Sequence, residues 1–292
     1  MASKKSLLKV SSVDITSNLT VRIPTVGEIL DDENGYYGIT SSLTASPFQY
    51  MVQLDDMGID YTTINEWDLF RMLMIRYSQH ELMCKVQIKE LEMRISNYSS
   101  KNDDYVKDYK QLQLLKDMLN DQEESFNLVL NDFHLTGEID NRIFGFNEYR
   151  NNNSDEVVLY NPATKVEINQ LVYNDLAEII RKINLFEKVK SKPGNESARK
   201  YLLEKERKKQ KRNAKKPKEP YLENLVVALV NTSEFPYNYE SCMDLSIYKF
   251  NQSLKQIQHK IAFDNTMVGV YAGTVDTSKM INKDALSWIS SK

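Results

Sequence analysis

The sequence predicts a mostly α-helical protein with a small antiparallel β-meander, which is an α+β fold class. Gly and Pro are scarce, with 9 and 7 among 292 residues, and this favours long continuous elements. Hydrophobic residues make up 41% of the chain, which is enough to bury a core. Most of the chain has apolar residues at helical spacing, whereas residues 140–168 contain short strand-like runs separated by turn-forming residues.

The N-terminal segment 1–18 is polar, and we expect it to be flexible. Residues 19–23 then alternate between apolar and polar side chains, which predicts a short half-buried strand that Pro24 ends. Thr25 and Glu28 have the spacing of a capping box, so a helix should follow them.

Two further helix starts are expected before the longest periodic region. Ser46 is followed by a proline, which favours a helix that continues to the stop signal at Gly58. The next helix should be capped by Thr62 or Thr63, each of which precedes Glu66 at or near capping-box spacing.

Residues 67–119 are predicted to form an antiparallel helical hairpin. In the first half, apolar side chains recur every three or four residues and form a stripe along one helix face. The polar residues 99–104 break this pattern, and a second periodic run begins at residue 105. The stripe is expected either to pack within the protein or to bind a partner. Its residues are Leu73, Tyr77, Cys84, Ile88, Leu91 and Ile95.

The predicted β-meander contains strands over residues 142–149, 155–160 and 165–168, with a turn at 151–154. A meander of this size is marginal alone and must pack on helices. Helical periodicity returns over residues 169–183, and we expect Pro193 and Gly194 to stop that helix.

In the C-terminal part, helices are predicted over residues 221–230 and 244–259, and a glycine-containing turn over 267–273. Between the two helices lies an aromatic loop. Its side chains are expected to form either a partner-binding surface or the core of this helical unit. The aromatic cluster consists of Phe235, Tyr237, Tyr239 and Tyr248.

The basic segment 199–218 is the strongest anomaly of composition. It has eleven Lys or Arg and two Glu, a net charge of +9, so the rest of a chain of net charge −3 carries −12. We expect a basic helix or linker that contacts an acidic surface, either of its own body or of a partner. Nucleic acid is the alternative ligand, although Tyr201 is the segment's one aromatic residue for base stacking. The candidate binding residues are Lys205, Arg207, Lys208, Lys209, Lys211 and Arg212.

These elements predict a helical body made of residues 19–66 and 120–292. The body includes the meander at about 140–168 and the basic segment 199–218. The hairpin 67–119 is inserted in this body and is expected either to pack on it or to project from it.

No motif in the sequence indicates catalysis, a metal or a cofactor. Cys84 and Cys242 lie far apart and form no CxxC pair, so we expect two reduced thiols. His80, His134 and His259 are scattered without zinc-ligand spacing, and no phosphate-binding glycine loop is present. We therefore predict that the protein is not an enzyme. The weaker alternative is a site assembled from distant residues, which a pocket with a perturbed ionisable group would indicate.

No apolar run has the length of a signal peptide or of a membrane helix, which predicts a cytoplasmic protein with no membrane partner.

Several stretches resemble a known group of proteins. They are VRIPTVGEIL at 21–30, LDDMGIDY at 54–61 with WDLF at 67–70, KPGN at 192–195, FPYNY at 235–239 and IYKF at 247–250. Together they resemble uncharacterised tail-module proteins of phages and prophages of Gram-positive bacteria. The resemblance spans most of the chain.

The resemblance implies a tail or baseplate component, or a tail assembly chaperone, and it carries no catalytic residues. The implied partners are other phage tail or baseplate proteins, with a homo-oligomer also open. The implied location is the cytoplasm of the bacterial host, and the virion if the protein stays in the particle. A nucleic-acid-binding protein that uses residues 199–218 is the alternative function.

Overall fold

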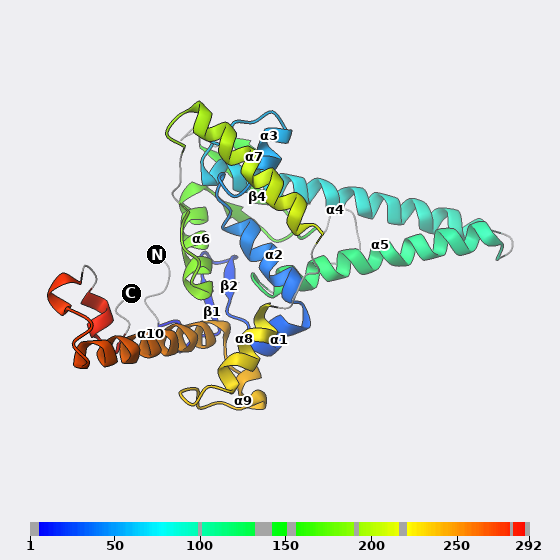
Figure 1. Cartoon of the computed structure of the whole chain (residues 1–292). Coiled ribbons are helices and arrows are strands. Elements are labelled where there is room, and N and C mark those ends of the chain that lie inside the picture. Colours follow the sequence, from blue (N-terminus) through cyan, green and yellow to red (C-terminus); the bar gives the residue numbers. More distant parts are fainter. Residues whose placement is uncertain are drawn as a thin grey trace.

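In the computed structural model of the chain, residues 6–98, 101–131, 142–150, 156–189, 193–215, 221–280 and 283–289 are described. Within them, helices predominate over one two-stranded and one three-stranded antiparallel sheet, which confirms the predicted α+β class. Figure 1 shows a central body from which two helical projections extend on opposite sides. One projection is the hairpin of α4 (Glu66–Ser96) and α5 (Asp103–Asn127), and the other is α10 (Ile247–Tyr271).

The first sheet pairs β1 (Ser12–Asp14) with β2 (Thr20–Arg22). Val13 lies opposite Val21, and both side chains are buried. This differs from the expected flexible segment 1–18, because burial of Val13 and the strand pairing hold residues 12–14 on the body.

Three short helices follow: α1 (Val26–Asp31), α2 (Glu33–Leu43) and α3 (Met51–Asp56). The predicted capping box is present, because Thr25 accepts the amide of Glu28 and Glu28 accepts the amide of Thr25. Helix α3 begins later than expected. The amide and hydroxyl of Ser46 both donate to the Gln49 side chain, so Ser46 caps no helix there.

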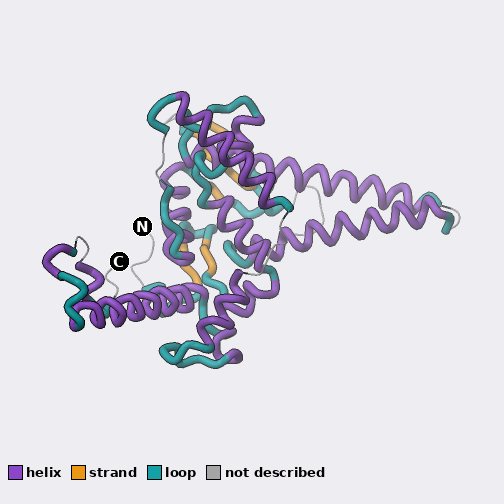
Figure 2. Tube along the Cα trace, in the orientation of Figure 1, coloured by secondary structure: helices purple, strands orange, loops and turns teal. Residues whose placement is uncertain are grey.

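The hairpin is the longest feature of the fold, and Figure 2 shows its two helices running side by side away from the body. Helix α4 is capped by Asn65, which forms a capping box with Asp68. The expected caps Thr62 and Thr63 are used differently, because both close a turn on Asp60.

The predicted meander has the strand order β3 (Asn147–Arg150), β4 (Val157–Asn161) and β5 (Val166–Ile168), all antiparallel. The expected turn at 151–154 lies outside the described residues. Strand β3 begins at residue 147 rather than 142 because backbone amides before it form hydrogen bonds with α4 and not with a neighbouring strand. The amides of Ile143 and Phe144 donate to the buried carboxylate of Glu81 on α4, at 3.0 and 2.7 Å.

After β5, α6 (Gln170–Asn184) packs across the body. It ends at Leu185, which adopts a left-handed conformation (φ 55°), well before the expected stop at Pro193. The basic helix α7 (Glu196–Asn213) follows, then α8 (Tyr221–Val230) and α9 (Tyr239–Met243). The short 3₁₀ helices η1 (Thr277–Lys279) and η2 (Lys283–Leu286) come after α10.

Helix α10 is longer than predicted and contains most of the expected turn 267–273. Gly269 lies inside the helix, and the helix stops only before Gly273, whose φ of +71° suits a glycine after a helix end. Because of these extra turns, α10 extends past the body, and the side chains on its second half are more exposed.

The main core joins both sheets to α1, α2, the start of α4, α6, α8 and the first half of α10. A second cluster lies under α3 and α7, and a third lies between the two helices of the hairpin. In the part of the chain that the structure describes, no helix is long and apolar enough to cross a membrane.

Candidate partner-binding surfaces

The stripe predicted on the hairpin is used for packing. Cys84 and Leu91 are buried against Leu112 and Leu115 of α5, with Ile88 and Ile95 packed beside them. Nearer the body, Tyr77 stacks on Phe144 with ring centroids 5.0 Å apart, and Leu73 packs against both the main and the second core. The stripe therefore joins the hairpin helices to each other and to the body.

The aromatic cluster is divided between core and surface. Phe235 is buried in the main core, 6.3 Å from the ring of Phe250, and Tyr248 packs at the core's edge. Tyr237 lies against Phe235 at 5.2 Å but remains exposed, as does Tyr239. These four residues do not form one continuous surface.

The basic helix α7 lies on α3 with an acidic turn beneath it. Arg207 donates to Asp55 and Asp56 at 2.7 and 2.6 Å, and these hydrogen bonds raise the pKa of Arg207. Arg199 forms two hydrogen bonds with Glu196 and lies 3.7 Å from Asp60. Leu203, between these two arginines, is buried in the second core. One side of α7 is thus attached to the body.

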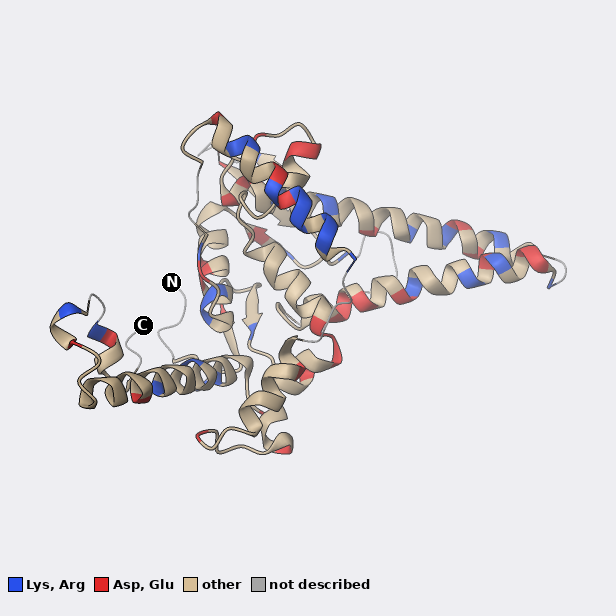
Figure 3. Cartoon of the chain, in the orientation of Figure 1, with Lys and Arg blue, Asp and Glu red and all other residues tan. Residues whose placement is uncertain are grey.

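The other basic residues predicted from the sequence point away from α3. Figure 3 shows Lys and Arg concentrated along α7, with acidic residues of α3 beside the helix. Lys209 is ion-paired with Glu206 on the same helix, whereas Lys205, Lys208, Lys211 and Arg212 are exposed. The last residues of the predicted basic segment, 216–218, lie outside the described residues.

Helix α10 has an apolar stripe along one face, and this stripe continues beyond residue 259, where the sequence predicted the helix to end. The positions are spaced alternately three and four apart, and all but one are apolar: Ile247, Phe250, Leu254, Ile257, Ile261, Val268 and Tyr271. The exception is Asp264, which interrupts the stripe between Ile261 and Val268 and is ion-paired with Lys260. The first four side chains pack on the body. Ile261, Val268 and Tyr271 continue the stripe beyond the body and are 44%, 69% and 84% exposed. The spacing was visible in the sequence, but the two nearby glycines suggested a turn.

The C-terminal segment 283–289 covers a different side of α10. The backbone oxygen of Trp288 accepts from Gln256 at 2.7 Å, and that of Ser287 lies 2.7 Å from a ring nitrogen of His259. Gln256 and His259 lie on the helix face opposite Ile261 and Val268. The exposed end of the stripe therefore stays uncovered although the chain folds back on the same helix.

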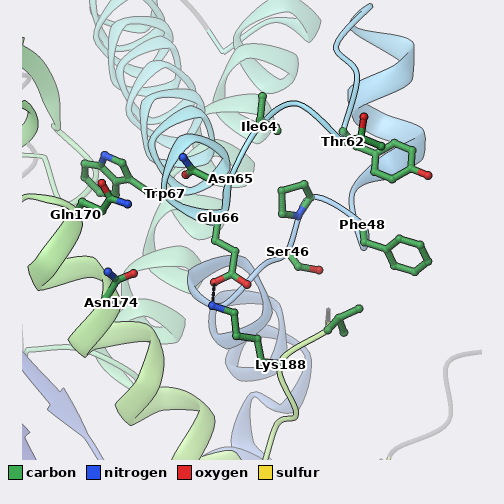
Figure 4. Close-up of a pocket in the computed structure, with 13 residues that line it drawn as sticks. Ser46, Phe48, Thr62, Ile64, Asn65, Glu66, Trp67, Gln170, Asn174 and Lys188 are labelled. Atoms are coloured by element: carbon green, nitrogen blue, oxygen red, sulfur yellow. Dashed lines mark ion pairs between the residues drawn. The ribbon is translucent and has the colours of Figure 1, made fainter. Parts of the chain in front are cut away.

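A cavity of about 390 Å³ lies between the start of α4, α6 and residues 46–48 (Figure 4). Glu66 is the acidic residue in its lining, and it is ion-paired with Lys188 at 2.9 Å and with Arg181 at 3.2 Å. Asn65, Asn174 and Gln170 add amide groups, and Ser46, Tyr61 and Thr62 add hydroxyl groups. The carboxylate of this cavity is therefore compensated by two cations.

The thiols and histidines do not assemble into a site in the described residues. Cys84 and Cys242 are free and buried, and burial raises the pKa of both thiols. His80 lies 3.9 Å from the Cys84 sulfur on the hairpin, far along the chain from His259, and His134 lies outside the described residues. Among the residues that the structure describes, no cluster of three or more His, Cys, Asp or Glu could hold a metal ion.

Comparison with known proteins connects the C-terminal part of the chain with phages. Residues 209–291 match the family model described as the YomV second domain. This family is derived from phages, with a Bacillus prophage as its source. No curated protein and no solved structure is significantly similar to the chain. The matched region contains the end of α7, the whole of α10 and the C-terminal segment, and it associates the chain with phages of Gram-positive bacteria.

Proposed function

We propose that this protein is a non-enzymatic assembly protein of a phage tail, either a tail or baseplate component or a tail assembly chaperone, and that it acts through protein–protein contacts. The observation that carries the proposal is the uncovered end of the α10 stripe. It lies within the region that matches a phage-derived family.

The geometry of the stripe favours a helix as the partner. Apolar residues that alternate three and four apart form the seam by which one helix packs along another. The body occupies the first half of this seam, and Ile261 and Val268 extend it beyond the body, one on each side of the charged Asp264. Another protein that continues the surface of the body would bury both side chains in the same way.

The energy available from this contact is moderate. Burial of the parts of Ile261 and Val268 that are still exposed would contribute roughly 2–3 kcal/mol before the cost of association. The two residues are therefore anchors of an interface that needs further contacts. Tyr271, at the end of the same stripe, adds an aromatic side chain of the kind enriched at such interfaces.

The hairpin of α4 and α5 projects from the body on the side opposite α10 and offers a second surface for a partner. Its internal stripe is closed, so a partner would bind its outer surface, where Met83, Met93 and Leu114 are exposed. Methionine side chains adapt to different partner surfaces, which suits a protein that contacts more than one component.

The direct experiment compares two double variants in cells where the phage develops. Ile261→Glu/Val268→Glu places charges on the uncovered stripe. Leu171→Glu/Val227→Glu places the same charges on exposed apolar residues of α6 and α8, and serves as the control. We expect the first variant alone to lose co-purification with tail or baseplate proteins and to lower the yield of tailed particles.

Mass spectrometry of purified particles then separates the two forms of the proposal. A stoichiometric amount of the protein in the particle identifies a structural component, and its absence from complete particles identifies a chaperone. The proposal fails if the wild-type protein co-purifies with no tail or baseplate protein and its loss leaves tail formation unchanged.

A further inference from the structure

Helix α7 has two basic faces with different roles. On the inner face, Arg199 and Arg207 are held by acidic residues of the chain, and Leu203 is buried between them. These contacts fix how the helix is rotated on the body. They therefore also fix which side chains point outward.

The outward face has regular spacing. Tyr201, Lys205, Lys208 and Arg212 follow one another at intervals of four, three and four residues, which places them on one side of α7. Lys215 follows two residues beyond the end of the helix. All five are exposed, and within the described chain none of the four cations is ion-paired. At the helical rise, the three cations within α7, from Lys205 to Arg212, span about 10 Å, and Lys215 lies three residues further along the chain.

We infer that this outward face of α7 binds the phosphate backbone of nucleic acid. A strand of DNA carries one negative charge per about 3.4 Å, so a row of four cations over this length meets several phosphates at once. Tyr201, at the N-terminal end of the row, is exposed and placed to stack on an unpaired base. This inference is independent of the assembly role proposed for α10.

The composition of the face favours nucleic acid over an acidic protein. Protein interfaces obtain most of their affinity from buried apolar or aromatic anchors at their centre. The centre of this face consists of Lys205, Lys208 and Arg212, with no apolar side chain among them. Release of counterions from a polyanion needs only the charges.

The rest of the chain limits nucleic-acid contact to this region. Outside residues 199–218 the chain carries a net charge of −12, which repels phosphate. Glu204 is the exposed acid beside the outward face, whereas Glu196 and Glu206 are paired with basic residues of α7. Glu204→Gln should therefore strengthen binding.

The test measures binding of the full-length protein to a 20-base-pair duplex and a 20-nucleotide single strand at several salt concentrations. We expect log affinity for the duplex to fall with log salt at a slope of roughly −3 to −4, as four phosphate contacts require. Lys208→Gln/Arg212→Gln should weaken binding and reduce this slope by roughly 2.

The matched control is Lys107→Gln/Lys110→Gln, which removes two exposed cations of α5 and should leave affinity and slope unchanged. Because all four substituted side chains are exposed, circular dichroism should show the same fold in both variants. Equal losses in the two variants, or binding to polyglutamate as tight as binding to DNA, would overturn the inference. Absence of any binding at low salt would do the same.

Discussion

Arg207 on α7 lies 2.6 Å from the carboxylate of Asp56 at the end of α3, and it also donates to Asp55. The segment with the most positive charge in the sequence is therefore attached to an acidic turn of its own chain. The sequence left open whether the basic segment contacts the acidic body, an acidic partner or nucleic acid. Arg207 contacts the acidic body. Among the described residues, Lys205, Lys208 and Arg212 on the other side of α7 are exposed and form no ion pair.

Removal of the Arg207 contact should release α7 without unfolding the body. Arg207→Ala eliminates both hydrogen bonds to α3, and because the pair is exposed to solvent the effect on global stability should be small. We expect faster amide exchange in residues 199–213 and an almost unchanged melting temperature. Arg212→Ala, on the outward face of the same helix, should change neither. An unchanged exchange rate in Arg207→Ala would show that Leu203 and the Arg199–Asp60 pair hold the helix without Arg207.

Loss of the Glu81 carboxylate should destabilise the body strongly. Glu81 is buried, accepts the amides of Ile143 and Phe144, and lies 3.3 Å from Lys85, whose side chain is also largely buried. Glu81→Ala leaves these donors without their acceptor, at a cost of about 2–4 kcal/mol in the free energy of unfolding. Urea denaturation measures the loss. Glu90→Ala, at an exposed position of the same helix, should cost less than about 0.5 kcal/mol.

The packing role of the hairpin stripe can be tested at Leu91. This side chain is fully buried between α4 and α5. Leu91→Ala should therefore reduce the free energy of unfolding of the hairpin by about 2–4 kcal/mol. Met83→Ala, which truncates an exposed side chain of α4, should change it by less than about 0.5 kcal/mol. Amide exchange in α4 and α5 reports the difference. Equal effects of the two substitutions would contradict the closed stripe.

The stability of the protein should fall at alkaline pH. Burial raises the pKa of Tyr37 to about 12, with Glu33 and Tyr221 adding to the shift. Burial also raises the pKa of Tyr36, whose hydroxyl donates to Asn184.

Both phenols are thus held neutral in the fold, whereas they ionise near pH 10 in the unfolded chain. The contribution of Tyr37 is complete below pH 10 and is lost as pH rises through about 12, and that of Tyr36 is lost at still higher pH. In denaturation from pH 9 to 12, Tyr37→Phe should reduce this fall. An identical pH profile for the variant and the wild type would contradict the assignment.

Strong local patterns allowed much of the fold to be predicted from the sequence. The predicted bounds of α8 agree with the structure, and the predicted start of α6 agrees within one residue, because their apolar faces follow a clear helical period. The capping box of Thr25 and Glu28 also formed as expected. Strand β1 was missed because three residues with one buried side chain have no periodic signal.

Other features depend on tertiary contacts that the sequence does not display. The end of α6 at Leu185 uses a left-handed residue that is not glycine, and no local signal marks it. The hydrogen bonds from the amides of Ile143 and Phe144 to Glu81 join residues more than sixty positions apart in the sequence. Whether the hairpin stripe packed internally and which arginine contacted the body were likewise decided by three-dimensional packing.

Site-specific photo-crosslinking at Val268 tests the central claim most directly. A photoreactive phenylalanine analogue replaces Val268 or, as the control, Val227, and both proteins are irradiated in cells that are assembling phage. We predict a covalent adduct with a tail or baseplate protein from position 268 and none from position 227. No adduct at 268, or adducts of equal yield at both positions, would contradict a partner that binds the uncovered end of α10.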